Sequence, residues 1–165
     1  MSTDYIGRPH DFDFLVGGTW HVADRRLRER HAGCTEWIHF EHTCNAVTMM
    51  DGRISSDENV FASAGFTGVT FRTLDTTTQQ WAIYWISSRD GKLQPPVHGG
   101  WNGDCGVFHG DDEDEGRPVR VRFLWERLGP DQARWSQDFA LAGQDGAPDG
   151  GWETNWVMEL TRVRD

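Results

Sequence analysis

The chain has few cysteines and no pattern that would pair them. Cys34, Cys44 and Cys105 are an odd number with no C-x-x-C pair, so neither a disulfide framework nor a structural zinc site is expected. The chain also lacks any window approaching the roughly 18 apolar residues that a membrane span needs. Its first residues, MSTDYIGRPHDFDF, contain no apolar signal region. These absences predict a cytoplasmic protein in a reducing compartment, with no membrane partner.

A basic stripe is missing as well. The formal net charge is −10, whereas binding to phosphates requires clustered positive charge. A nucleic-acid partner is therefore not expected. Part of the acidity lies in one run at residues 111–115, DDEDE, which repels itself and is predicted to form a solvent-exposed loop. The run lacks the glycine and glutamate spacing of an EF-hand calcium loop.

Motifs for nucleophilic, phosphate or metal chemistry are not found. There is no G-x-S-x-G sequence, and no glycine-rich loop opens a helix. The segment H-F-E-H contains His39, Glu41 and His42, which are suitable metal ligands by residue type. On a strand, however, His39 and Glu41 share one face while His42 lies on the other. The three cannot converge on one ion, so no metal site is predicted.

Aromatic residues and glycines dominate what remains. The 165 residues include 9 Trp and 9 Phe but only 2 Tyr, and 19 Gly interrupt the chain at short intervals. This mixture is typical of many short strands joined by tight turns. Alternating patterns predict strands at residues 19–30, 35–46, 66–74, 79–87, 97–102 and 105–109, with at most a short strand at 58–62. Three more strands are predicted between Arg117 and Arg162.

These segments predict an all-β fold in a single domain spanning residues 1–165. About nine or ten strands are expected, with no amphipathic helix long enough to cover a sheet. A sheet of that size closes into a barrel or splits into a sandwich, and the succession of hairpins favours an antiparallel up-and-down β-barrel. Residues 8–16, RPHDFDFLV, predict one short helical turn that plugs an end of the barrel.

The last three strands carry the strongest candidate site, because large aromatic residues alternate there with polar ones. Val121, Phe123 and Trp125 oppose Arg120, Arg122 and Glu126. Trp135, Gln137 and Phe139 oppose Arg134 and Asp138, while Trp152, Thr154, Trp156 and Met158 oppose Glu153, Asn155 and Val157. The polar faces either meet solvent or line a cavity. In the second case, the ligand-binding residues are predicted to be Trp81, Trp85, Arg122, Trp125, Gln137, Glu153, Asn155 and Trp156.

Several motifs resemble those of a bacterial group of small calycin-like proteins. They are FDFLVGGTWHV near the start, WAIYW followed by PPVHGGWNG and GVFHG in the middle, and VRFLW, ARWSQDF and WETNWVMELTR at the end. The resemblance covers the chain from Phe12 to Arg162. It implies a lipocalin-like or fatty-acid-binding-protein-like β-barrel, and it implies no particular reaction, substrate or cofactor.

The haem-binding nitrobindins are more distantly similar, sharing the barrel and a glycine-tryptophan opening like Gly18-Thr19-Trp20. Nitrobindins hold haem through an axial histidine late in the chain, and here no histidine follows His109. Haem is therefore kept as an alternative, and otherwise no cofactor is expected.

Two further functions compete. The leading expectation is a barrel that binds a small hydrophobic or aromatic molecule with one polar or acidic group. The alternative is a cofactor-independent enzyme of isomerase, cyclase, hydratase or decarboxylase type. In that enzyme Glu153 or His39 would be the catalytic acid or base, and Arg122 would stabilise an oxyanion. The high aromatic content also predicts an exposed apolar surface suited to a homodimer.

Overall fold

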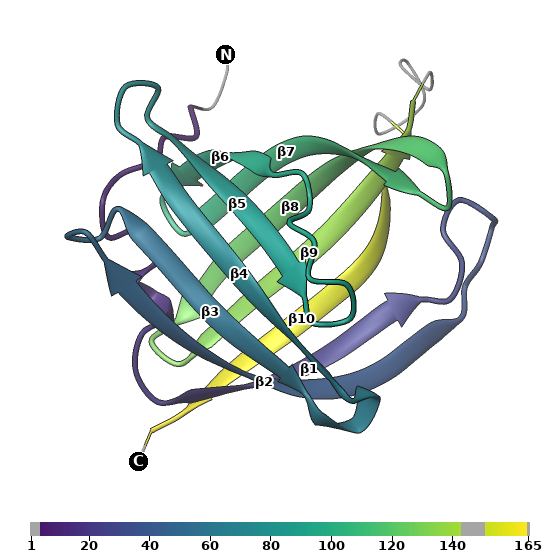
Figure 1. Ribbon diagram of the computed structural model, residues 1–165, viewed down its shortest axis with the longest axis horizontal. Helices are drawn as coiled ribbons and strands as arrows, with labels where there is room; N and C mark the ends of the chain where they lie inside the picture. Colours follow the sequence, from purple (N-terminus) through teal and green to yellow (C-terminus); the bar gives the residue numbers. More distant parts are fainter. Residues whose placement is uncertain (1–3, 143–150, 165) are drawn as a thin grey trace.

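Ten antiparallel strands form one closed barrel in the computed structural model, which describes residues 4–142 and 151–164. Each strand pairs with the next along the chain, and β1 pairs with β10 to close the barrel (Figure 1). The strands are β1 (Thr19–Leu27), β2 (Trp37–Met49), β3 (Ile54–Phe61), β4 (Phe66–Asp75), β5 (Gln80–Ser87), β6 (Val97–Asn102), β7 (Cys105–Asp114), β8 (Arg117–Gly129), β9 (Gln132–Leu141) and β10 (Glu153–Val163). The prediction of an all-β, up-and-down barrel is confirmed.

Strand alternation sets which residues face inward. In β1, Trp20, Val22 and Asp24 are buried, whereas the intervening His21 and Ala23 are exposed. Successive side chains of a strand point to opposite faces of the sheet, so the even-numbered residues of β1 lie inside the barrel. The pairing register carries this inner face around all ten strands.

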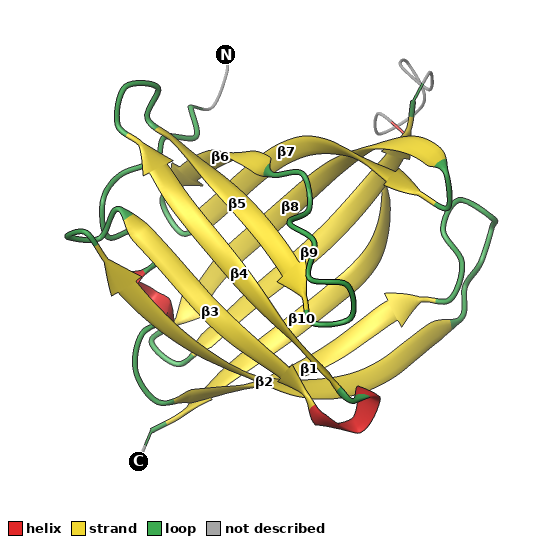
Figure 2. Ribbon diagram, in the orientation of Figure 1, coloured by secondary structure: helices red, strands yellow, loops and turns green. Residues whose placement is uncertain are grey.

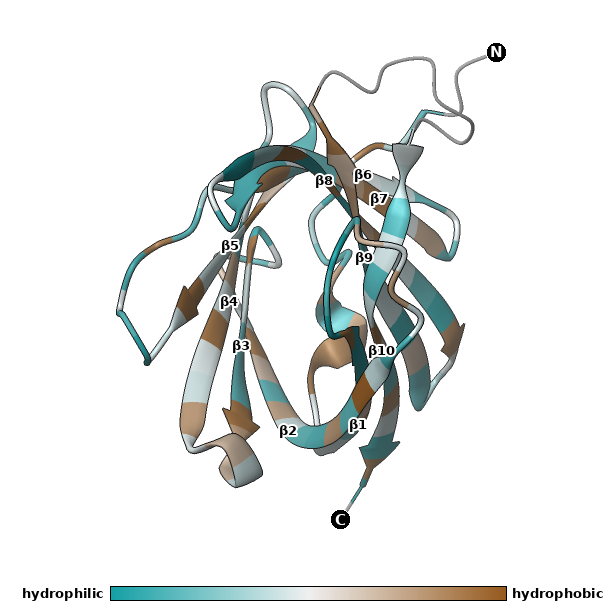
Figure 3. Cartoon of the chain, turned by 90° about the vertical axis from the view of Figure 1, so that its right-hand side faces the viewer, coloured by the Kyte–Doolittle hydropathy of each residue, from teal (hydrophilic) through white to brown (hydrophobic). Residues whose placement is uncertain are grey.

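The short helix η1 (Asp13–Leu15) closes one end of the barrel, as the sequence predicts. Among the described residues, the helical segments are only η1 and η2 (Ala62–Ala64), and both are single turns (Figure 2). In the view into the barrel from the other end, η1 lies at the back of the interior (Figure 3). Phe12, which precedes η1, is 1% exposed and contacts the rings of Trp81, Trp101 and Phe108. This aromatic cluster forms the floor of the barrel.

Two strands differ from the sequence expectation, and in each the part that the sequence did not predict has acidic or other polar residues on the inner face. The predicted short strand at 58–62 is in fact β3, whose inward residues include Ser55, Asp57 and Asn59. Strands were predicted from apolar residues that recur at every second position. A strand whose inward residues are polar lacks this pattern and is not detected by it. The predicted loop at 111–115 is largely the end of β7. Its Asp114 is buried against the guanidinium of Arg30, which removes the expected repulsion.

We expect the barrel floor to control stability. Replacing Phe12 with alanine (Phe12→Ala) should lower the free energy of unfolding by about 3–5 kcal/mol, because it leaves a cavity among rigid aromatic rings. Denaturant unfolding followed by tryptophan fluorescence measures this change. The control is Leu93→Ala, since Leu93 is 58% exposed and its loss should change stability by no more than about 0.5 kcal/mol. Equal effects of the two substitutions would show that η1 does not plug the barrel.

Candidate functional site

A cavity of about 150 Å³ lies inside the barrel, between the aromatic floor and the open end. Apolar side chains from β5, β8, β9 and β10 form most of its wall, namely Ile83, Trp85, Val121, Phe123, Trp125, Trp135, Trp156, Met158 and Leu160. The wall extends to Asp111, whose side chain is 89% exposed. The cavity is therefore continuous with the protein surface at this end, which we call the mouth.

Gly68 of β4 leaves room for the side chain of Trp85, which lines the cavity. A Cβ atom at Gly68 would lie only 2.1 Å from the ring of Trp85, which is far inside van der Waals contact. The absence of a side chain thus lets the indole lie across the inner face of β4, beside the cavity. Any larger residue at position 68 would have to push Trp85 into the cavity.

The opposite wall, built from β1 to β4, is polar and buried. The imidazole Nδ1 of His42 lies 2.5 Å from Asp24 Oδ2, and Nε2 lies 3.0 Å from Asn59 Oδ1. The amide of Asn59 donates to Asp57 Oδ1 at 2.6 Å, and Arg72 donates to Asp57 Oδ2 at 2.6 Å. Trp156 of β10 donates its indole N–H to Asp24 at 2.9 Å. The chain Asp24–His42–Asn59–Asp57–Arg72 is called the buried network below.

Hydrogen-bond directions in the buried network hold the His42 ring between two partners. Because the Asn59 NH₂ group faces the Asp57 carboxylate, the Asn59 carbonyl oxygen faces one ring nitrogen. The Asp24 carboxylate faces the other ring nitrogen. At the far end of the network the guanidinium of Arg72 pairs with the carboxylate of Asp57, and this pairing permits charge to remain in an apolar interior.

Arg72 joins the buried network to the barrel floor. Its guanidinium lies 4.6 Å from the ring centre of Phe12 and 5.8 Å from that of Trp125, and only 2% of its side chain is exposed. The neighbouring Cys44 also lines the cavity. Burial, reinforced by the Asp57 carboxylate, raises the pKa of the Cys44 thiol well above its ordinary value. Cys44 is thus a protonated, weakly polar part of the wall rather than a nucleophile.

A β-bulge in β10 places two amides on the inner face. The register of β10 against β9 shifts between Thr154 and Trp156, so Asn155 is an extra residue that turns inward. Asn155 is fully buried, and its Oδ1 accepts a 2.8 Å hydrogen bond from Gln137 Nε2. Gln137 lines the cavity beside Trp156. Strict alternation along β10, which the sequence reading assumed, fails at this bulge.

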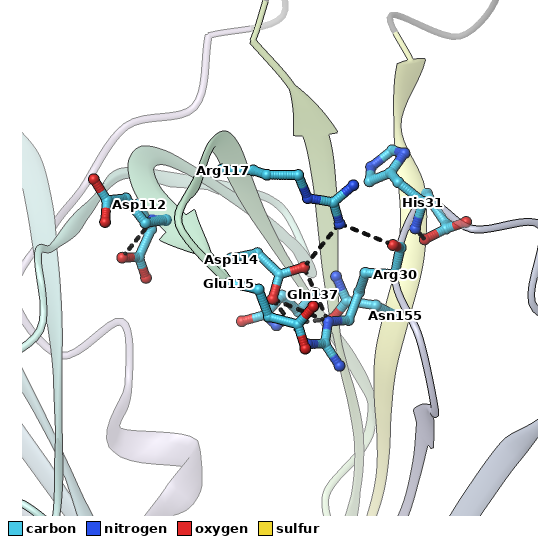
Figure 4. Close-up of polar contacts among 10 residues, drawn as sticks. Arg30, His31, Asp112, Asp114, Glu115, Arg117, Gln137 and Asn155 are labelled. Carbon is cyan, nitrogen blue, oxygen red and sulfur yellow. Dashed lines mark hydrogen bonds and ion pairs between the residues drawn. The ribbon is translucent and has the colours of Figure 1, made fainter.

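Charged residues gather around the mouth (Figure 4). Arg30 from the β1–β2 connection donates to Asp114 at 2.8 Å, and Arg117 lies 3.7 Å from the same carboxylate. The hydrogen bond from Arg30, together with the charges of Arg30 and Arg117, lowers the pKa of Asp114. Glu153 accepts a 2.7 Å hydrogen bond from the backbone N–H of His31. These contacts fix the β1–β2 connection against β7 and β10.

The predicted site residues are distributed over four places. Trp85, Trp125, Gln137 and Trp156 line the cavity, and Asn155 contacts Gln137 from beside it. Trp81 belongs to the floor, where its indole donates to Asp11, and Glu153 lies at the mouth. Arg122 lies on the outer face, where it donates to Asp138 at 2.8 Å and stacks on Trp152. His39 is exposed on the outer face of β2.

Sequence reasoning missed the buried network entirely. Its five residues come from four strands, and each looks like an ordinary surface residue in its own segment. One signal was available, since Asp24 follows Trp20 and Val22 at two-residue spacing and His42 shares a face with Cys44. Extending those alternating faces without requiring apolar residues would have placed Asp24 and His42 inside the barrel.

Among the described residues, no group of three or more His, Cys, Asp or Glu side chains is arranged to hold a metal ion. No helix in residues 4–142 and 151–164 is long and apolar enough to cross a membrane. No protein-family model matches the chain, and no curated protein matches it significantly. The closed ten-stranded barrel is consistent with a calycin-like fold, while the resemblance to bacterial proteins of that type and to nitrobindins stays a prediction.

Breaking the buried network should be costly. Arg72→Met leaves the Asp57 carboxylate buried without its cation, so we expect the free energy of unfolding to fall by about 3–5 kcal/mol. The matched control is Arg28→Met, which removes an exposed ion pair to Glu36, with side chains 57% and 62% exposed; the expected loss is below about 1 kcal/mol. Urea denaturation measures both. Similar losses in the two variants would contradict the assignment of Arg72 as a structural cation.

Proposed function

We propose that this protein binds a small, mostly apolar molecule with one polar group inside the barrel. The observation that carries the proposal is the cavity of about 150 Å³, walled by tryptophans and continuous with the mouth. Ligand sites in proteins are typically concave and apolar, with a few polar groups that fix orientation. The cavity has this composition, because outside the buried network most lining residues are aromatic or aliphatic. The polar exceptions are Thr70, Gln94, Gln137, Asp111 and Asp112.

The size and shape of the cavity favour an aromatic ring or short alkyl chain. An apolar space of roughly 150 Å³ accommodates a molecule of about the size of benzene. The indole rings of Trp135 and Trp156 lie at 86° to each other with centres 5.7 Å apart, so an inserted ring can stack on one and meet the edge of the other. A ligand with a longer tail would extend toward the mouth.

Gln137 is the residue best placed to orient the ligand. One N–H of its side-chain amide is used by Asn155, and an amide carries a second N–H and a carbonyl oxygen. No partner for these groups occurs among the described residues. A hydroxyl, carbonyl or carboxyl group of the ligand would therefore find both a donor and an acceptor on this side chain, next to Trp156.

Filling the cavity should abolish binding. Val121 lines the cavity, so Val121→Phe places a ring where the ligand would sit. We expect toluene, indole and benzyl alcohol to change the tryptophan fluorescence of the native protein and to bind at least about tenfold more weakly to this variant. Val47→Phe is the control, because Val47 is exposed on the outer face of β2. Absence of binding to the native protein would contradict the proposal.

A cofactor-independent enzyme is the second candidate, and the observation that favours it is the Asp24–His42 pair on the cavity wall. A histidine held by a carboxylate is a common general acid or base. The exposed His39 lies outside the barrel, so it cannot act on a molecule in the cavity. His42 replaces it as the candidate, acting through Nε2 once a substrate has displaced Asn59 from that nitrogen. The reaction class would be isomerase, hydratase or decarboxylase chemistry.

Catalysis and binding are separated by the fate of the ligand. If the barrel is an enzyme, a bound hydroxy or oxo acid should be converted during incubation with native protein, as followed by proton NMR. The variant His42→Gln removes the imidazole but keeps an amide that can replace one of its two hydrogen bonds. We expect it to abolish conversion while binding persists. Recovery of every tested ligand unchanged would leave binding as the function and remove the enzyme hypothesis.

Haem fits the residues poorly. His42 is the histidine that lines the cavity among the described residues, and both its ring nitrogens already contact Asp24 and Asn59. An axial ligand needs one free nitrogen. Binding haem through His42 would therefore require breaking the buried network. Haem binding is not the function that we propose.

A further inference from the structure

Arg26 lies on the inner face of the barrel at the level of the ligand-orienting residues. The register pairs Arg26 of β1 with Trp156 of β10, and Trp156 with Gln137 of β9. These three residues therefore form one row across adjacent strands. The guanidinium carbon of Arg26 lies 5.0 Å from the centre of the Trp156 ring. Gln137 and Trp156 line the cavity, whereas Arg26 lies just outside its lining, near Arg30 and Asp114 of the mouth.

The guanidinium of Arg26 makes no hydrogen bond or ion pair with another described residue, and its Nε atom is buried without a partner. Burial and the nearby positive charge of Arg30 lower the pKa of Arg26. The carboxylate of Asp114 acts in the opposite direction without overcoming them, and Arg89 adds to the lowering. Arg26 is thus a partly desolvated cation that an anion would stabilise.

The carboxylates near Arg26 are already engaged. Asp114 is held by Arg30 and Arg117, and Glu153 accepts from the backbone of His31. Asp112, which lies apart from the Arg30–Asp114 pair in Figure 4, accepts a 2.8 Å hydrogen bond from the backbone of Glu113. Asp114 therefore stabilises the charge of Arg26 only from a distance, and no acid of the described residues forms a direct ion pair with it.

We propose that Arg26 binds the carboxylate of an aryl-substituted or aliphatic monocarboxylic acid whose apolar part occupies the cavity. This inference rests on the proposed binding function and names the chemical class of the ligand and its direction of entry. The apolar end enters first and packs between the tryptophans. The carboxylate stays at the mouth, where the planar fork of Arg26 donates two parallel hydrogen bonds and the second N–H of Gln137 donates a third.

A monoanion is favoured over a phosphate or a dicarboxylate. Arg26 supplies one unpaired guanidinium, and its planar fork matches the two oxygens of a single carboxylate. The acidic residues Asp112, Asp114 and Glu153 surround the mouth, so a second negative charge on the ligand would meet repulsion. The indole of Trp156 beneath the guanidinium adds an apolar surface for the carbon atoms next to the carboxylate.

Matched acids and alcohols test the inference. The probes are phenylacetate, 3-phenylpropionate and 4-phenylbutyrate, each paired with the alcohol of the same chain length, and isothermal titration calorimetry measures their dissociation constants. For the best chain length, we expect native protein to bind the acid at least about tenfold tighter than the alcohol. In Arg26→Gln the acid should lose this advantage, while the alcohol should bind within about twofold of its native affinity.

Two further variants control for charge and for folding. Arg25→Gln removes the same charge from the next residue, which is exposed on the outer face and stacks on Trp37; the preference for the acid should be unchanged. Arg26→Lys keeps the charge but loses the fork, so an intermediate preference is expected. Circular dichroism melting verifies that each variant is folded, and Arg26→Lys carries the test if the glutamine variant is not.

The possible results distinguish the role of Arg26 from the binding function on which it rests. If the alcohols bind native protein but the acids bind no tighter, or if Arg26→Gln keeps the native preference, the role of Arg26 is wrong while the binding function stands. If neither acids nor alcohols bind native protein, the proposed function itself fails. A preference for the acid that disappears in both Arg26→Gln and Arg25→Gln would reflect the general potential of the mouth and would also overturn the inference.

Discussion

The interior of this barrel depends on the pairing of charges that are kept from water. Arg72 forms an ion pair with Asp57, and Asp24 is hydrogen-bonded to His42, in a space otherwise lined by aromatic and aliphatic side chains. Each charge would be strongly unfavourable alone, and each is tolerated because the next residue in the network compensates it. Since the network crosses β1, β2, β3 and β4, and Trp156 donates to it from β10, it also fixes the relative positions of five neighbouring strands.

The buried network divides the barrel into two unlike halves. One half is a polar wall whose hydrogen bonds hold its side chains in place, and the other is an aromatic wall from β8, β9 and β10. Rigid rings and paired charges cannot readily rearrange to fill the space between them, whereas flexible aliphatic side chains would collapse into it. The cavity is therefore a consequence of the residues that stabilise the barrel. At its edge, Gln137 donates a hydrogen bond to Asn155, the extra residue of the bulge in β10.

The sequence predicted the fold well because closure depends on patterns that are local. Alternating segments such as Gln80–Ser87 and short turns at Gly residues are enough to indicate many antiparallel strands. The site was predicted only in part. Trp85 and Trp156 were predicted to line the cavity because large aromatic side chains favour the walls of ligand sites, and both do line it. Arg122 was predicted to lie with them, but its hydrogen bond to Asp138 holds it on the outer face. Whether a polar residue faces inward depends on partners from other strands, and β3 was undervalued for this reason.

Two inward arginines illustrate how structural and binding charges differ. Arg72 donates to Ser55 and Asp57 and packs on two aromatic rings, so its charge is used within the fold. Arg26 has the same orientation and a similar aromatic contact with Trp156, yet no carboxylate among the described residues pairs with it. Removing Arg72 should therefore affect stability first, whereas removing Arg26 should affect the choice of ligand. Arg72 is thus part of the buried network, whereas Arg26 is the residue proposed to recognise an acid at the mouth.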